Sequence, residues 1–217
     1  MNEPIVATFS IVGYDPLTKE WGIAVQSKFL AVGAICPYAQ AGVGAIATQS
    51  YANTSFGPRG LKLLSEGKSA QEVVDILVNS DPRRSKRQLG IVDSQGNAAT
   101  FTGDECHDWA GGITGSNFAA QGNILVSDKT VEAMAEVFLD MEGCLAERLL
   151  ESLDAGQRVG GDSRGQQSAA LLIVQDEGGY GGFNDRKVDL RVDDHAQPIT
   201  ELKRLYGLHR EIFSRTK

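Results

Sequence analysis

The chain has 217 residues, of which 41% are hydrophobic and 23% are charged. These proportions are typical of one globular domain, so neither disorder nor a fibrous repeat is indicated. The formal net charge is −7 and no run of Lys or Arg forms a stripe, so nucleic acid is not expected as a partner. No stretch reaches the roughly 18 apolar residues of a membrane helix, and we therefore expect no membrane partner.

Cysteine usage and motif content favour a cytoplasmic protein that needs no cofactor. Cys36, Cys106 and Cys144 form no CxxC pair, so neither a disulfide framework nor a zinc site is predicted. The N-terminus lacks the basic and apolar regions of a signal peptide. No GxGxxG follows a predicted strand, and neither a Walker loop nor GxSxG is present, which argues against nucleotide binding and serine-hydrolase chemistry.

Apolar runs and turn residues predict strands and helices in the first half of the chain. Asp15-Pro16 is a turn signal between two β-branched runs and predicts a hairpin. Ser69 followed by Glu72 predicts a capping box at a helix start. The small residues of 41–49 predict close packing against another layer. The expected elements are strands 5–13, 21–27, 41–49, 88–93 and 97–102 and helices 58–65 and 69–78.

Strands and helices continue to alternate in the second half. Val131, Met134 and Phe138 recur at helical spacing after Asp128, the expected N-cap. The apolar run QSAALLIV predicts a strand buried on both faces. The pattern as a whole predicts an α/β (α+β) fold of two packed sheets with helices on both outer faces, in one domain spanning 1–217. The expected elements are strands 118–125, 167–174 and 187–194 and helices from Asp128, at 145–153 and at 197–217.

Four loops hold polar side chains at a density that core packing does not require. The loop 48–57 precedes a helix whose N–H groups could hold an anion or a carbonyl, and an extended helix cap explains it equally well. The loops 158–170 and 178–195 are rich in glycine, and the remaining loop is Ser27–Lys28. The candidate site residues in the four loops are Ser27, Lys28, Gln49, Asn53, Asp162, Arg164, Gln166, Asp185, Asp189 and Arg191.

The last of these loops leads into a strand with alternating charges. Asp189, Arg191 and Asp193 share one face of it, which predicts either a salt-bridge ladder or a group that orients substrate. Asp194 and His195 follow, but no second His stands at a metal-ligand spacing, so no metal site is predicted.

A family resemblance rests on long segments distributed along the chain. They are TFSIVGYDP, EWGIAVQSKFLAVGAICPYAQAGVGAIATQSYAN, FGPRGLKLL, AAQGNIL, GGDSRGQQSAALLIV and GGYGGFNDRKVDLRVDDH. They resemble the bacterial family called domain of unknown function 1028, from about Ile5 to Leu205. The resemblance implies the N-terminal nucleophile (Ntn) hydrolase superfamily and its four-layer αββα sandwich of two antiparallel sheets.

The superfamily implies a specific chemistry. The first residue of its mature chains attacks an amide carbonyl and uses its own α-amine as the base, a group whose ordinary pKa is about 7.7 to 8.0. The resemblance places Thr8 at this position, with Ser27 and Lys28 beside the nucleophile and Asn53 as an oxyanion donor. A solvated strand end is the alternative for Ser27 and Lys28. The remaining candidates would bind the substrate, with the 162–166 loop orienting a polar or charged group.

The N-terminal extension 1–7 departs from this pattern. Asn2 is too large for ordinary removal of the initiator Met, so Thr8 keeps an acylated nitrogen unless the chain is cut before it. Two functions therefore stay open: an amidohydrolase acting on a small amide or short peptide, and a non-catalytic domain that binds a small ligand in the same cleft. Related folds pack into rings or dimers, and we expect a homo-oligomer.

Overall fold

The computed structural model describes residues 5–6 and 8–214, and it contains two antiparallel sheets. The larger sheet has six strands in the order β10-β9-β2-β1-β8-β7. Its central hairpin pairs Asp15 with Glu20 next to the turn and Thr8 with Ser27 at the far end. The strands of this sheet are β1 (Thr8–Asp15), β2 (Glu20–Ser27), β7 (Gly111–Gly115), β8 (Phe118–Gly122), β9 (Ser168–Val174) and β10 (Arg186–Val192).

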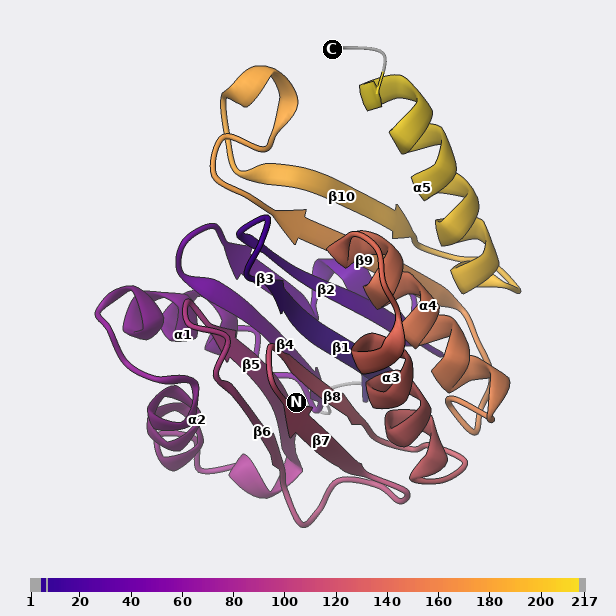
Figure 1. Cartoon of the computed structure of the whole chain (residues 1–217). Helices are drawn as coiled ribbons and strands as arrows, with labels where there is room; N and C mark the ends of the chain where they lie inside the picture. The colour runs from indigo at the N-terminus through magenta and orange to yellow at the C-terminus, as the bar shows by residue number, and fades with distance from the viewer. Residues whose placement is uncertain (1–4, 7, 215–217) are drawn as a thin grey trace.

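The smaller sheet has four strands in the order β3-β4-β5-β6. They are β3 (Pro37–Gln40), β4 (Gly44–Ser50), β5 (Arg87–Asp93) and β6 (Ala98–Thr102). Helices cover the outer faces of both sheets, as Figure 1 shows. The helices are α1 (Phe56–Ser65), α2 (Ala70–Asn79), α3 (Lys129–Asp140), α4 (Leu145–Arg158) and α5 (Pro198–Ser214), with the short η1 (Val32–Ala34), η2 (Arg84–Lys86) and η3 (Tyr180–Gly182).

Three apolar cores separate the four layers. One lies between the six-stranded sheet and helices α3, α4 and α5, and contains Phe9, Phe118 and Phe138. A second lies between the two sheets and contains Val25 and Val92 among others. The third lies between the four-stranded sheet and helices α1 and α2. The fold is therefore the four-layer αββα sandwich that the sequence predicts.

The local predictions agree with most of the elements. Both hairpins are confirmed, and Ser69 and Glu72 form the expected capping box of α2. Asp128 occupies the expected N-cap position before α3, but its backbone is already helical and its side chain makes no cap hydrogen bond. Helix α4 continues beyond the predicted end to Arg158, and strands β3 and β7 were not predicted.

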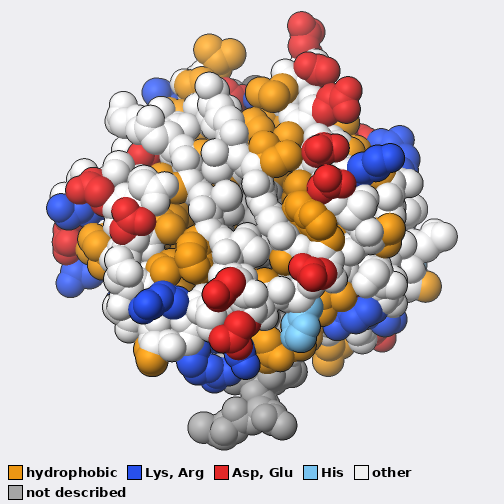
Figure 2. Space-filling view, turned by 90° about the horizontal axis from the view of Figure 1, so that it is seen from below, with side chains coloured by type: hydrophobic (Ala, Val, Ile, Leu, Met, Phe, Trp, Pro, Cys, Tyr) orange, Lys and Arg blue, Asp and Glu red, His pale blue; other side chains and the backbone are white. Residues whose placement is uncertain are grey.

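The surface carries charge of both signs. On the face shown in Figure 2, Lys and Arg side chains are interspersed with Asp and Glu. In the described part of the chain, no helix is both long and apolar enough to span a bilayer.

Candidate functional site

Thr8 is the first residue of β1, an interior strand of the six-stranded sheet. Side chains alternate between the two faces of a strand, and Phe9 and Ile11 belong to the core beneath the helices. Thr8 and Ser10 therefore face the four-stranded sheet, as do Val12 and its neighbours in the core between the sheets. Thr8 is completely buried, so in this chain its hydroxyl is not open to solvent.

The Thr8 hydroxyl lies between a backbone carbonyl and a second hydroxyl. It donates to Val6 O at 2.8 Å, and its oxygen lies 3.1 Å from Ser27 Oγ. Val6 is itself fixed to the end of β4, because its N–H donates to Ser50 O at 2.8 Å and its carbonyl accepts from Ser50 N at 3.0 Å. Val6, which forms an isolated β-bridge with Ser50, thus covers the Thr8 hydroxyl.

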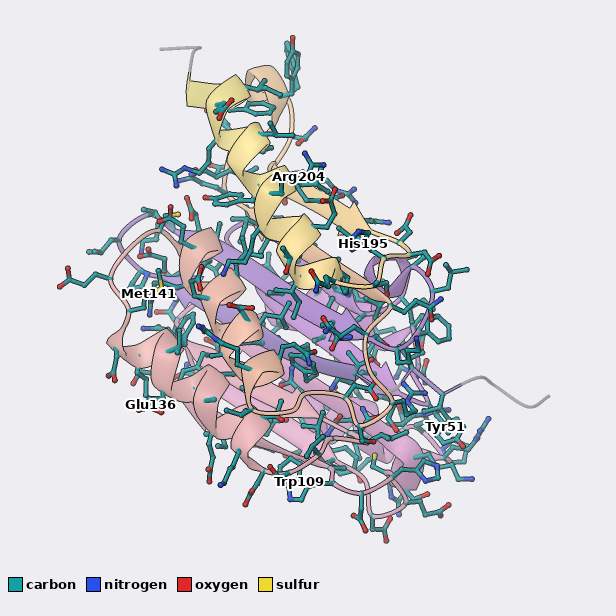
Figure 3. All side chains as sticks on the ribbon, turned by 90° about the vertical axis from the view of Figure 1, so that its right-hand side faces the viewer. Tyr51, Trp109, Glu136, Met141, His195 and Arg204 are labelled. Atoms are coloured by element: carbon teal, nitrogen blue, oxygen red, sulfur yellow. The ribbon has the colours of Figure 1, made fainter. Side chains whose placement is uncertain are left out.

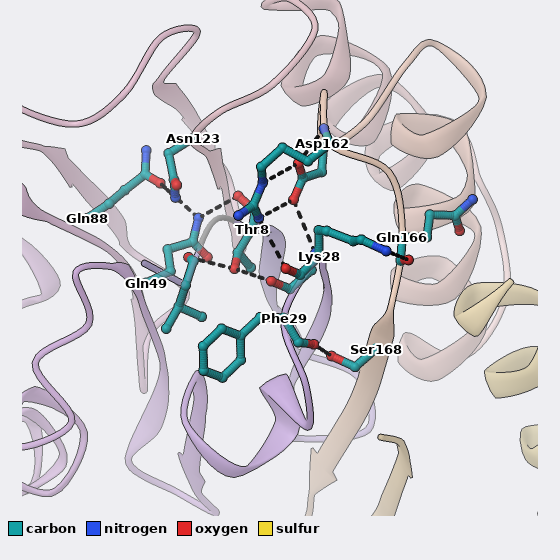
Figure 4. Close-up of polar contacts among 12 residues, drawn as sticks. Thr8, Lys28, Phe29, Gln49, Gln88, Asn123, Asp162, Gln166 and Ser168 are labelled. Atoms are coloured by element: carbon teal, nitrogen blue, oxygen red, sulfur yellow. Dashed lines mark hydrogen bonds and ion pairs between the residues drawn. The ribbon is translucent and has the colours of Figure 1, made fainter. Parts of the chain in front are cut away.

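Asp162 joins the loop after α4 to the end of β2, as Figure 4 shows. Its buried carboxylate accepts from Lys28 N at 3.1 Å and from Arg164 through two nitrogens, Nε at 3.1 Å and Nη2 at 2.9 Å. The second nitrogen also donates to Lys28 O at 3.3 Å. Because Lys28 directly follows Ser27, this ion pair lies one residue from the Thr8–Ser27 contact.

The Lys28 ammonium is directed away from Thr8. Lys28 is exposed and its Nζ donates to Gln166 O at 3.2 Å. Its contribution to the Asp162 cluster comes from its main-chain atoms. The sequence analysis expects Lys28 beside the nucleophile. In the structure its ammonium group binds Gln166 O instead.

A buried network of amides lies behind Thr8 in the space between the sheets. Gln49 donates from Nε2 to Thr8 O at 3.3 Å and to Gln88 Oε1 at 2.9 Å, and its Oε1 accepts from Ser10 Oγ at 2.6 Å. Asn123 donates from its backbone N–H to Thr8 O at 3.0 Å and from Nδ2 to Gln88 Oε1 at 2.8 Å. The network holds the Thr8 carbonyl with two donors and so fixes the start of β1.

Glutamine at position 121 completes this network through a close approach between the sheets. Its Nε2 donates to Ser10 Oγ at 2.7 Å. A Cβ on Gly90 would lie 1.9 Å from Gln121 Oε1, so the amide occupies the space that a side chain at position 90 would take. Nearby, burial raises the pKa of the Cys36 thiol to about 12, which keeps it protonated and unsuited to act as a nucleophile.

Other candidates lie elsewhere. Asn53 donates from Nδ2 to Asp81 Oδ2 at 2.7 Å and accepts from Ser55 N at 3.1 Å. It therefore belongs to the junction of α2 and β5 and not to the Thr8 cluster. Asp185 accepts from Ala41 N at 3.0 Å. Asp189 pairs with Arg191 at 3.2 Å on β10, as the salt-bridge interpretation expects for these two residues.

The structure thus brings together about half of the predicted residues. Thr8, Ser27, Gln49, Asp162 and Arg164 gather at the ends of β1, β2 and β4, with Lys28 and Gln166 at the margin. The prediction missed Ser10, Gln88, Gln121 and Asn123, all of them completely buried. A polar residue inside an apolar strand, as in FAAQG, was the available signal.

Asp194 and His195, which lie just after β10, both form hydrogen bonds within the chain. His195 accepts from Gln197 N at 3.0 Å, and Figure 3 shows it beside the start of α5. Asp194 accepts from Gln167 at 3.1 Å. Among residues 5–6 and 8–214, no three His, Cys, Asp or Glu side chains are grouped in a way that could hold a metal ion.

Comparisons with known proteins identify the family but not an activity. Among curated proteins, no sequence matches this chain. A crystal structure of protein SPO2555 from Silicibacter pomeroyi, described as family-model DUF1028, is 32% identical and has a TM-score of 0.85 over 94% of this chain and 89% of that chain. Anbu (ancestral beta-subunit) from Yersinia bercovieri is 12% identical with a TM-score of 0.42, over 97% of this chain and 98% of that chain. The model of the family of unknown function DUF1028 matches residues 8–202, and the chain belongs to this family.

Proposed function

We propose that this protein is an amidohydrolase of the Ntn type, acting on a small amide or short peptide, with Thr8 as its nucleophile once the bond between Ala7 and Thr8 has been cut. Ala7 lies outside the described residues. The observation that carries the proposal is the place of Thr8: it starts a central strand, faces the space between the sheets, and has its hydroxyl 3.1 Å from that of Ser27.

The chemistry follows from freeing one nitrogen. Hydrolysis of the Ala7–Thr8 bond consumes one water and leaves a carboxylate on Ala7 and an amine on Thr8. The amine takes the hydroxyl proton while Oγ1 attacks the substrate carbonyl carbon, and it returns the proton to the departing amine. Water then hydrolyses the ester on Thr8 and restores the hydroxyl. Ser27 is suited to position the Thr8 oxygen, which it already contacts.

The segment before Thr8 acts as a cover in this proposal. Val6 is 3% exposed, and its N–H and carbonyl both form hydrogen bonds with the backbone of Ser50. The Val6 carbonyl also accepts a hydrogen bond from the Thr8 hydroxyl. Loss of residues 1–7 removes the bridge and the acceptor together. The same cleavage would therefore free the amine and uncover the hydroxyl.

The Asp162–Arg164 pair is suited to meet the substrate. The Asp162 side chain is buried, whereas that of Arg164 is 36% exposed, so the pair presents a fixed guanidinium at the edge of the cluster. A guanidinium held by a bidentate carboxylate is preorganised for binding a carbonyl or carboxylate. We therefore expect the preferred amides to carry an anionic or strongly polar group.

The test compares two shortened chains that differ only in what precedes Thr8. In one variant Thr8 directly follows the initiator Met, which is removed before a small residue. A matched control carries one added Gln between Met and Thr8, so that Met is retained and the amine of Thr8 stays blocked. Both are assayed on a panel of small amides and dipeptide amides, and circular dichroism checks the fold. We expect turnover with the first variant and a loss of at least about a thousandfold with Thr8→Ala in the same background.

Equal turnover by the blocked control, or by Thr8→Ala, would overturn the Thr8 mechanism. A folded, unblocked variant that is inactive across the panel would favour the competing function, a non-catalytic domain that binds a small polar ligand. That alternative is favoured by the complete burial of Thr8 in the chain with residues 5–6 in place. Multiple turnover by the full-length chain with residues 1–7 still attached, shown by intact mass, would reject the non-catalytic alternative.

A further inference from the structure

Strand β10 lies at an edge of the six-stranded sheet and has a self-complementary sequence. Within the described residues its neighbour in the sheet is β9, and Figure 1 shows it as the outermost strand. We propose that a second copy of this chain pairs with β10 in antiparallel fashion, about a two-fold axis at Leu190. The six-stranded sheets of the two copies would then form one continuous sheet across the dimer.

The charges of β10 support this register. With Leu190 opposite Leu190, Asp189 of each copy lies opposite Arg191 of the other. Residues 186–187, at the register shift before Val188, and residues 193–194, just after the end of β10, carry opposite charges at the two ends of this pairing. Opposite charges placed directly across an antiparallel pair are stabilising, and like charges are destabilising. Both charged positions in the regular part of β10, 189 and 191, thus meet a charge of the opposite sign.

Neighbouring registers are less favourable. Residues directly opposite each other in an antiparallel pair lie on the same face of the sheet. A two-fold axis perpendicular to the sheet must therefore be centred on a residue that pairs with its own copy, and not between two residues. A centre at Asp189 would oppose two carboxylates, and a centre at Arg191 would oppose two guanidinium groups. Centres further along the strand run into the register shift between Arg186 and Val188, or past the end of β10 at Val192.

The two faces of β10 would also match. Val188 and Val192 lie in the core beneath α5, and Leu190 is partly buried against it. In the proposed register Val188 of one copy lies opposite Val192 of the other, on the same side as the Leu190 pair. The apolar layer beneath the helices would therefore continue without interruption from one copy to the next.

Exposed apolar side chains next to β10 provide further area. Tyr180 is 78% and Phe183 87% exposed in the loop that leads into the strand. Ile212 is 64% and Phe213 45% exposed near the end of α5, and a cavity of about 480 Å³ lies between that loop and helix. A stable dimer buries more than about 1,000 Å² of surface in total, which is more than one pair of strands buries by itself. The exposed apolar side chains next to β10 are placed to contribute the remaining buried area.

Charge reversal tests the pairing and its register. Asp189→Arg places two Arg residues opposite each other in the homodimer, and Arg191→Asp places two Asp residues opposite each other. Each change occurs twice in a two-fold dimer, so each single variant should raise the dimer dissociation constant about tenfold or more. An equimolar mixture of the two single variants should dimerise again, because every mixed pair is then complementary. Sedimentation equilibrium measures the constants, and circular dichroism checks the fold.

Glu66→Arg is the matched control. Glu66, at the C-cap of α1, pairs with Lys62 at 3.9 Å. Figure 1 shows α1 away from β10, so the reversal should leave the dimer constant unchanged. A wild-type chain that stays monomeric at its highest soluble concentration would overturn the proposal. So would single variants that dimerise as the wild type does, or a mixture of folded variants that does not recover.

Discussion

The Asp81 carboxylate lies where three segments of the chain meet. It accepts from Asn53 Nδ2 at 2.7 Å, from Arg87 Nε at 2.9 Å and from Arg83 N at 2.8 Å. Burial by itself would raise the pKa of this carboxyl, but the hydrogen bonds and the charge of Arg87 outweigh it and lower the pKa. The ionised form therefore ties the end of α2 to β5 and to the loop before α1.

Asn53→Ala tests this assignment through the pH dependence of stability. Because the pKa of Asp81 is lowered in the folded state, its contribution is present above the unfolded value of about 3.9 and is lost as the pH falls through the folded pKa. Removing the Asn53 donor should raise that pKa, so acid unfolding should begin at higher pH. At pH 7 the free energy of unfolding should fall by about 1–2 kcal/mol. Urea titrations at several pH values measure both, and Asn79→Ala, an exposed site, should leave them unchanged.

Helix α2 shows how a local signal defines an element. Ser69 accepts from Glu72 N at 3.4 Å, and Glu72 accepts from Ser69 N at 2.9 Å. Val73 and Leu77 on the inner face are buried against the four-stranded sheet. The cap satisfies N–H groups that no turn of the helix can reach, and the buried face orients the helix on the sheet.

Ser69→Ala should destabilise the protein by about 1 kcal/mol, because it removes the side-chain acceptor of the cap. Ser65→Ala is the matched control. The Ser65 hydroxyl donates to Lys62 O at 2.7 Å within α1, where the carbonyl already belongs to the helix, and its loss should change stability by less than about 0.5 kcal/mol. Thermal unfolding of the two variants side by side measures the difference. Equal effects would show that the cap adds nothing to this helix.

The two sheets differ in width, and this difference shapes the whole molecule. The six-stranded sheet faces a four-stranded one, with β6 packed near β7 at one side and β3 near β9 at the other. Strand β10 therefore extends beyond the smaller sheet. Its main packing partners are β9 and α5, and the second copy that we propose would add at its outer edge.

A dimer across this edge makes stability depend on protein concentration. Each tenfold rise in concentration adds about 1.4 kcal/mol per dimer, or about half of that per chain. For a chain of this size the melting temperature should rise by about 2 °C per tenfold. Scanning calorimetry over two orders of magnitude in concentration measures it. The dependence of the Asp189→Arg chain should be displaced to about tenfold or more higher concentration, whereas a flat dependence in the wild type would contradict a dimer that stabilises the folded chain.

The elements that could be predicted are those that local sequence specifies. The β1–β2 and β5–β6 hairpins have turn residues between apolar runs, and β9 is a continuous apolar run. Strands β3 and β7 escaped prediction because PYAQ and GGITG carry neither signal. They form where a neighbouring strand offers its edge, at the margins of the two sheets.

The sequence by itself determined the layered arrangement of strands and helices, because periodicity and turn chemistry act over a few residues. Its long motifs carried the resemblance to the family, and with it the assignment of Thr8. The tertiary structure alone decided that Val6 and Ser50 close over Thr8, that Asn53 binds Asp81, and that buried amides hold the Thr8 carbonyl. These contacts join residues far apart in the chain. Their geometry exists only once the two sheets have packed face to face, and no local pattern encodes it.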